Sequence, residues 1–155
     1  MSNELILYFT ISGNTKAVAE AIENETGGDI AEIIPQTPYT TEYTKLLEIA
    51  KKELSQNYLP PIKDLNIDLD SYDTIYIGTP VWYGTYAPPI ATFLSENDLE
   101  DKKIAPFITH GGGGQGNTSK DIAKLSKGSK HLNPLVVAGA NTSEVKDWTE
   151  GIKNE

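Results

Sequence analysis

The sequence of 155 residues predicts an α/β protein in which a five-stranded parallel sheet carries helices on both faces. Short apolar segments have the length of buried strands, and segments with helical spacing of apolar residues separate them. Small polar residues or glycines stand where strands give way to helices. The length favours one domain, residues 1–155, with a core that needs no disulfide or structural metal.

The first part of the chain predicts two strands and two helices. An apolar and aromatic run predicts a strand over residues 5–9, and a second strand is expected over residues 29–34, before Pro35. A helix is expected over residues 14–26, where Gly27-Gly28 supplies a C-terminal cap. A second helix is expected over residues 41–56. The apolar residues along one face of that helix are Tyr43, Leu46, Leu47, Ala50 and Leu54.

The middle of the chain predicts one strand and one helix. Residues 57–71 contain Pro60-Pro61 and are expected to form a loop packed on the surface. The third strand is expected over residues 72–79. A helix over residues 89–97 follows, because the fixed backbone angle of Pro88-Pro89 suits the first turn of a helix.

The last part of the chain completes the alternation. A fourth strand is expected over residues 103–109, then a glycine-rich loop and a helix over residues 118–127. His131 is expected as a surface residue before a fifth strand at residues 135–138. The last helix is expected over residues 143–152, with Val145, Trp148 and Ile152 facing inwards.

Composition excludes several classes of chemistry. The chain has no cysteine, which excludes disulfides, iron–sulfur clusters held by thiolates, zinc–cysteine sites and a cysteine nucleophile. Redox work would therefore need a bound cofactor. The net charge of −9 argues against nucleic acid and anionic membranes as partners. It permits steering towards a basic protein, while the alternative, a charge that only keeps the protein in solution, stays open.

The sequence also indicates where in the cell the protein is expected. The first residues carry no basic region, and the apolar run over residues 5–9 is too short for a signal sequence. No window approaches the roughly 20 apolar residues of a membrane span. We therefore expect a cytoplasmic protein, consistent with the lack of cysteine.

Three loops follow the first, third and fourth expected strands, where an open parallel sheet binds its ligands. The first loop contains Thr10, Ile11, Ser12, Gly13, Asn14 and Thr15. It places hydroxyls, an amide and a glycine at a helix N-terminus, which suits a phosphate. An ordinary N-terminal cap is the alternative. Neither the Walker pattern nor the three-glycine dinucleotide pattern is present, so we expect a terminal phosphate held by hydroxyls and amides.

The other two loops suit a flat ligand. The loop after the third strand contains Thr79, Pro80, Val81, Trp82, Tyr83 and Gly84, followed by Thr85-Tyr86. Its aromatic rings could stack on a heteroaromatic ring, although Trp82 could instead plug the edge of the core. The loop after the fourth strand contains Thr109, His110, Gly111 and Gly112, and continues through further glycines to Asn117. Consecutive glycines let the backbone pass close to a ligand, whereas a flexible surface loop is the alternative.

These residues resemble a known family. The run Tyr8-Phe9-Thr10-x-Ser12-Gly13-Asn14-Thr15 resembles the phosphate-loop signature of flavodoxins. The segments 78–85 and 106–112 are similar to the flavin-ring loops of bacterial flavodoxin-like proteins, so the resemblance covers about residues 4–150. It implies a three-layer flavodoxin-like fold with strand order 2-1-3-4-5, bound FMN and a role in electron transfer.

The resemblance also implies residue roles. The loop over residues 10–15 would hold the FMN phosphate, residues 80–84 would border the isoalloxazine ring, and residues 109–112 would line its other side. Gly84 could turn its peptide to offer a carbonyl to the flavin. No residue is assigned to catalysis or to metal binding. Many flavodoxins stack a tyrosine from the loop after the fourth strand, but this loop has no aromatic residue. One flavin face is therefore expected to be open, which would weaken FMN binding or admit a substrate.

Two functional classes remain. The first is a low-potential carrier of single electrons, a monomer that docks with basic-surfaced reductases and acceptors. The second is an NAD(P)H-dependent flavin or quinone reductase on the same fold, in which His110 could donate a proton. The sequence offers no cluster of Arg and Lys for a nucleotide 2′-phosphate, which favours the carrier. A phosphoacceptor signalling domain would need acidic residues that these loops lack.

Overall fold

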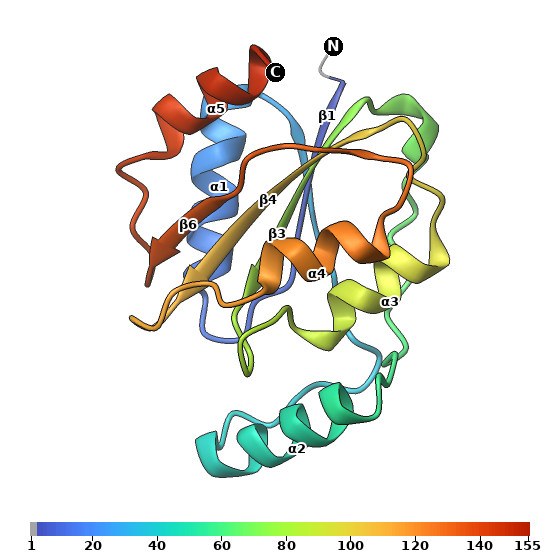
Figure 1. The fold of residues 1–155 in the computed structure, drawn as a ribbon, viewed down its shortest axis with the longest axis vertical. Coiled ribbons are helices and arrows are strands. Elements are labelled where there is room, and N and C mark those ends of the chain that lie inside the picture. The colour runs from blue at the N-terminus through green and yellow to red at the C-terminus, as the bar shows by residue number, and fades with distance from the viewer. Residues whose placement is uncertain (1–2) are drawn as a thin grey trace.

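A computed structural model describes residues 3–155 and has the expected alternation of strands and helices (Figure 1). Its strands form one parallel sheet of six strands in the order β2-β1-β3-β4-β5, with β6 also paired to β4. The predicted α/β class and strand order are thus confirmed. The strands are β1 (Glu4–Tyr8), β2 (Asp29–Glu32), β3 (Thr74–Pro80), β4 (Lys103–His110), β5 (Lys130–His131) and β6 (Leu135–Ala138).

The helices lie within about two residues of their predicted bounds. They are α1 (Asn14–Thr26), α2 (Tyr43–Ser55), α3 (Pro88–Glu96), α4 (Thr118–Leu125) and α5 (Val145–Lys153). A short 3-10 helix, η1 (Leu69–Ser71), ends the loop that precedes β3. Helices α1 and α5 cover one face of the sheet, and α3 and α4 cover the other (Figure 1). No helix within residues 3–155 is both long and apolar enough to cross a bilayer.

Both faces of the sheet are buried, which explains why its strands are apolar runs rather than alternating patterns. Leu5 and Leu7 of β1 point to the side of α3, whereas Ile6 points to the side of α1. The α3 side is filled by Ile75, Ile77, Ile90, Phe93 and Ile122, and the α1 side by Val18, Ile22, Tyr76, Phe107 and Ile152. These two layers fix the carboxyl ends of the central strands relative to one another.

The edge beside β4 differs from the expected single fifth strand. Two short strands share that edge, because β5 pairs with the start of β4 and β6 pairs with its end. His131 is exposed and precedes the strand at residues 135–138, as expected, but it also lies in the additional short strand β5, opposite Ile104. Pro134 lies between the two strands and has no N–H to give to the ladder, which accounts for the interruption.

Helix α2 stands apart from the other helices (Figure 1). Only Ala50 of this helix is buried, while Leu46 and Leu54 are partly buried against the core. The side chain of Tyr43 is largely exposed, with a relative accessible area of 73%. Part of the apolar face of α2 is therefore free to form a wall of the site described next.

Candidate functional site

The loop between β1 and α1 has the geometry of an anion site. Gly13 precedes the helix with φ 94°, a left-handed conformation that a residue without a side chain adopts readily. Its N–H donates to the Thr10 hydroxyl at 3.0 Å. Within the described chain no side chain caps α1, so the first backbone amides of the helix remain available. The ordinary cap considered as an alternative is thus absent, and the geometry fits a phosphate.

Two buried threonines join this loop to the end of β4. The Oγ1 atoms of Thr15 and Thr109 lie 2.8 Å apart, within hydrogen-bond distance. Thr15 has a relative accessible area of 1%, so its hydroxyl faces the protein and not the solvent. This bond sets the distance between the first loop and the third.

The loop after β3 is closed by a two-residue turn. Trp82 and Thr85 exchange backbone hydrogen bonds of 2.8 and 3.1 Å across Tyr83 and Gly84. Both central residues have positive φ, 49° for Tyr83 and 76° for Gly84, as in a type I′ turn. A bulky residue is uncommon in that conformation. The base of the loop is held by the Thr79 hydroxyl, which accepts from the Ala87 N–H at 3.0 Å and donates to the Pro80 carbonyl at 2.8 Å.

Trp82 packs into the core, which was one of the two roles that the sequence left open, and it also borders the cavity. It packs edge-on against Phe9 and Tyr39, with ring centroids 5.6 and 5.1 Å away, and it also lines the cavity. The Tyr39 hydroxyl donates to Glu53 Oε1 at 2.6 Å. Burial, and then this bond to Glu53, raises the pKa of Tyr39 well above its usual range. The phenol is therefore neutral, and the cluster holds the Trp82 ring in place.

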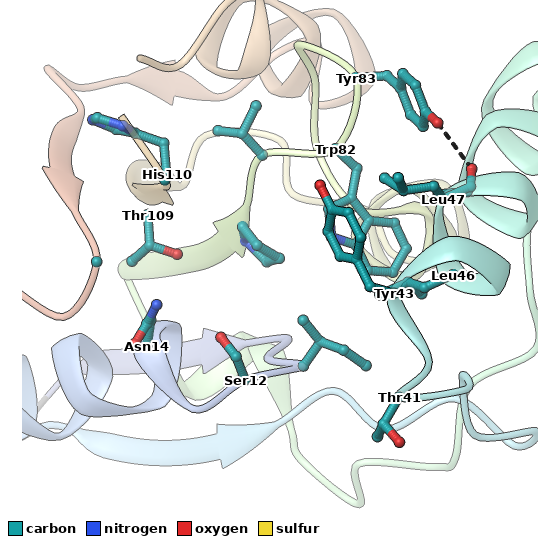
Figure 2. Close-up of a pocket in the computed structure, with 16 residues that line it drawn as sticks. Ser12, Asn14, Thr41, Tyr43, Leu46, Leu47, Trp82, Tyr83, Thr109 and His110 are labelled. Carbon is teal, nitrogen blue, oxygen red and sulfur yellow. Dashed lines mark hydrogen bonds between the residues drawn. The ribbon is translucent and has the colours of Figure 1, made fainter. Parts of the chain in front are cut away.

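Tyr83 lies at the rim of the site. Its side chain is half exposed, and its hydroxyl donates to the Leu47 carbonyl of α2 at 3.1 Å (Figure 2). This bond connects the turn after β3 to helix α2.

The glycine-rich loop after β4 is held at both ends. At its start, His110 Nδ1 accepts from the Gly112 and Gly114 N–H groups at 2.9 and 3.2 Å. At its end, the Asn117 N–H donates to the Gly84 carbonyl at 2.7 Å. A Cβ on Gly116 would lie 2.6 Å from that carbonyl oxygen, so this position excludes larger residues. The Gly84 carbonyl, expected to be free to turn towards a flavin, is thus engaged by the neighbouring loop.

The three loops and α2 enclose a cavity of about 740 Å³ (Figure 2). Ten of the predicted site residues line it: Ile11, Ser12, Asn14, Pro80, Val81, Trp82, Tyr83, Thr109, His110 and Gly111. The other six do not line it, but their hydrogen bonds and backbone angles shape the loops: Thr10, Gly13, Thr15, Thr79, Gly84 and Gly112.

Sequence reasoning missed a further part of the wall. The residues it did not assign to the site are Thr41, Tyr43, Leu46, Leu47, Ala50 and Gly139. The apolar face of α2 was visible as a pattern, but a pattern does not tell whether a helix packs on the sheet or beyond its edge. Among the lining residues described, none is Asp, Glu, Lys or Arg. The cavity therefore combines an anion site with neutral, largely apolar walls.

Comparisons with known proteins agree with this architecture. The family model described as Flavodoxin matches residues 3–152. The crystal structure of a flavoprotein in complex with FMN from Lactobacillus acidophilus superposes with a TM-score of 0.80 at 30% identity, covering 96% of this chain and 99% of that chain. A candidate flavoprotein from Bacteroides eggerthii gives a TM-score of 0.87 at 26% identity, covering 99% of each chain.

One relative found by sequence similarity is named as an enzyme and not as a flavoprotein. The NAD(P)H dehydrogenase (quinone) of Paraburkholderia phymatum is 34% identical over 98 residues, which are 62% of this chain. This chain spans about half of that relative's length, 47%.

Proposed function

Because this chain belongs to the flavodoxin family, we propose that it is a low-potential electron-transfer protein that shuttles single electrons between redox partners. Its cofactor is FMN. When bound, FMN supplies electron transfer in steps of one or two electrons, and the protein supplies binding, orientation and electrostatics.

The residues of the site fit FMN. The uncapped amides of α1, with Ser12 and Asn14, would hold the phosphate, since a helix N-terminus favours an anion. Trp82 and Tyr83 would border one side of the ring, with Pro80 and Val81 beside them. The other side would be lined by Thr109, His110 and Gly111.

The observation that carries the proposal is the neutral lining of the cavity. A reductase that uses NAD(P)H must also hold the phosphates of that nucleotide, for which Arg and Lys side chains are suited. Among the described residues that line the cavity there is no Arg or Lys. A carrier needs only a flavin with an accessible edge. A partner would approach that edge beside the rings of Tyr43 and Tyr83, which are exposed.

The acidic net charge supports the docking of a partner protein more than it supports tuning of the flavin potential by a nearby carboxylate. The net charge is −9, yet no carboxylate in the described chain lines the cavity. The negative field therefore comes from the surface as a whole. Such a field disfavours extra negative charge on the flavin, which lowers its potential, and attracts basic-surfaced partners.

The second candidate is an NAD(P)H-dependent flavin or quinone reductase. It is favoured by the name of the curated relative and by the apolar wall of α2, beside which a second flat molecule could lie.

Anaerobic mixing of the FMN-loaded protein with NADPH or NADH separates the two functions. We expect the flavin absorbance to persist with either nucleotide alone and to bleach quickly once a catalytic amount of an NADPH-dependent flavodoxin reductase is added. Rapid bleaching by the nucleotide alone, with turnover when a quinone is supplied, would contradict the carrier and establish the reductase.

A further inference from the structure

His110 works as a hydrogen-bond acceptor for the glycine-rich loop. Its Nδ1 atom accepts from both Gly112 N–H and Gly114 N–H. An imidazole nitrogen accepts only through its lone pair, so the ring must be neutral with its proton on Nε2. Figure 2 shows the ring pointing away from Trp82 and Tyr83, although His110 itself lies at the cavity wall.

The loop that His110 holds runs from one side of the cavity to the other. It starts at Gly111, which lines the cavity, and ends where Gly116 and Asn117 pack on the Gly84 carbonyl. Gly84 adjoins Tyr83, so the far end of the loop reaches the proposed border of the flavin ring. The far end is fixed by backbone contacts that do not titrate. The near end depends on one imidazole lone pair.

We propose that His110 is a pH-sensitive positioning residue for this loop. The neutral ring holds the loop in the shape of the FMN site, and the protonated ring releases it and weakens FMN binding. Protonation at Nδ1 removes the acceptor and places a donor opposite two N–H groups. The inference rests on the proposed position of FMN, but the state of the loop can be measured without FMN.

Few other titratable side chains face His110. Among the described residues that line the cavity, they are the phenols of Tyr43 and Tyr83. The first loop brings Ser12 and Asn14, and β6 brings Ala138 and Gly139, none of which titrates.

Helix α4, which follows the glycine-rich loop, carries a carboxylate that is already engaged. Asp121 accepts from the Thr85 hydroxyl at 2.6 Å and lies 3.8 Å from Lys124 Nζ. The pH response is therefore assigned to His110.

The first test follows the Gly112 and Gly114 amides of the FMN-free protein by NMR between about pH 8 and about pH 5, the range in which histidine changes charge. We expect both amides to shift together with the His110 ring signal and to exchange faster with solvent at the lower pH. In His110→Asn, Oδ1 takes the place of Nδ1 as an acceptor that does not titrate, so both amides should stay constant. The proposal would be overturned if the Gly112 and Gly114 amides of the wild-type protein did not shift together with the His110 ring signal.

The second test measures the dissociation constant of FMN at the same two pH values. We expect wild type to lose about fivefold to tenfold more affinity than His110→Asn, the loss expected when one or two net hydrogen bonds disappear. The FMN phosphate also takes up a proton in this range, and the Asn variant reports that contribution alone. His110→Ala should bind weakly at both values.

His131→Asn is the matched control, because it removes the other histidine, in β5, and should behave as wild type. Equal pH dependence in wild type and His110→Asn would overturn the proposal. A protein that binds no FMN at any pH would contradict the proposed function, and the amide titration would still decide the role of His110.

Discussion

At the scale of single residues, the hydroxyl pair of Thr15 and Thr109 connects two loops that are far apart in the chain. Both side chains are buried, and their oxygens lie 2.8 Å apart. Thr15 is expected to help hold the phosphate, and its hydroxyl also bonds the Thr109 hydroxyl. This bond fixes the first loop relative to the third.

Thr15→Val should destabilise the FMN-free protein by about 1–3 kcal/mol, because it leaves the buried Thr109 hydroxyl without its partner. Thr109→Val should cost a similar amount. The double variant should recover most of the loss, since it removes both polar groups and preserves their shape. Urea denaturation of the four proteins measures this cycle, and strictly additive losses would show that the two hydroxyls do not interact.

Residue types predicted much of the site, and the reason is chemical. Hydroxyls and glycine before a helix suit an anion wherever the fold places them, so the first loop was predicted from residues 10–15 alone. The partners of His110 could not be predicted, because they depend on how the following glycines fold back. A histidine beside glycines is equally compatible with a proton donor, an acceptor or a solvated side chain.

At the scale of elements, α2 is the part of the site that the sequence did not place. Its apolar spacing predicted the helix but not its position beyond the sheet. The split edge strand was missed for a related reason: a two-residue strand such as β5 has no periodic signal of its own. The central strands were predictable because both of their faces are buried and their apolar runs are continuous.

Tyr83→Phe should loosen α2, because it removes the bond from the Tyr83 hydroxyl to the Leu47 carbonyl. We expect faster hydrogen exchange across residues 43–55, by about threefold to tenfold, since one net hydrogen bond is worth roughly 0.5–1.5 kcal/mol. Exchange in β3 and β4 should stay unchanged. Tyr43→Phe is the control, because it removes a hydroxyl from an exposed ring of α2 itself. Equal exchange in both variants would contradict a role of the Tyr83 hydroxyl in holding α2.

At the scale of the whole molecule, the charge of −9 coexists with buried, neutral phenols close to carboxylates. Burial, and then the negative charge of Glu32, raises the pKa of Tyr8 from 10.0 to about 12. Tyr39 is shifted in the same direction by burial and Glu53. The fold therefore favours the protonated form of both phenols.

The raised pKa values of these phenols predict that the folded protein loses stability at alkaline pH. A raised pKa contributes stability that is complete below the unfolded value of 10.0 and is lost as the pH rises towards about 12. The free energy of unfolding should therefore fall across that interval, and Tyr8→Phe should reduce the fall. Urea titrations at several pH values measure it, with Tyr43→Phe, which changes an exposed ring, as the control. An unchanged fall in Tyr8→Phe would refute the assignment to this phenol.

The central claim is that the uncapped start of α1 and the neutral cavity together recognise a flavin that carries a terminal phosphate. Titration of the FMN-free protein with FMN and with riboflavin, which lacks the phosphate, tests this claim most directly. We predict that FMN binds at least about a hundredfold more tightly, because hydrogen bonds to a charged group contribute roughly 1.5–3 kcal/mol each. Equal affinity for the two flavins, or no binding of either, would contradict the account.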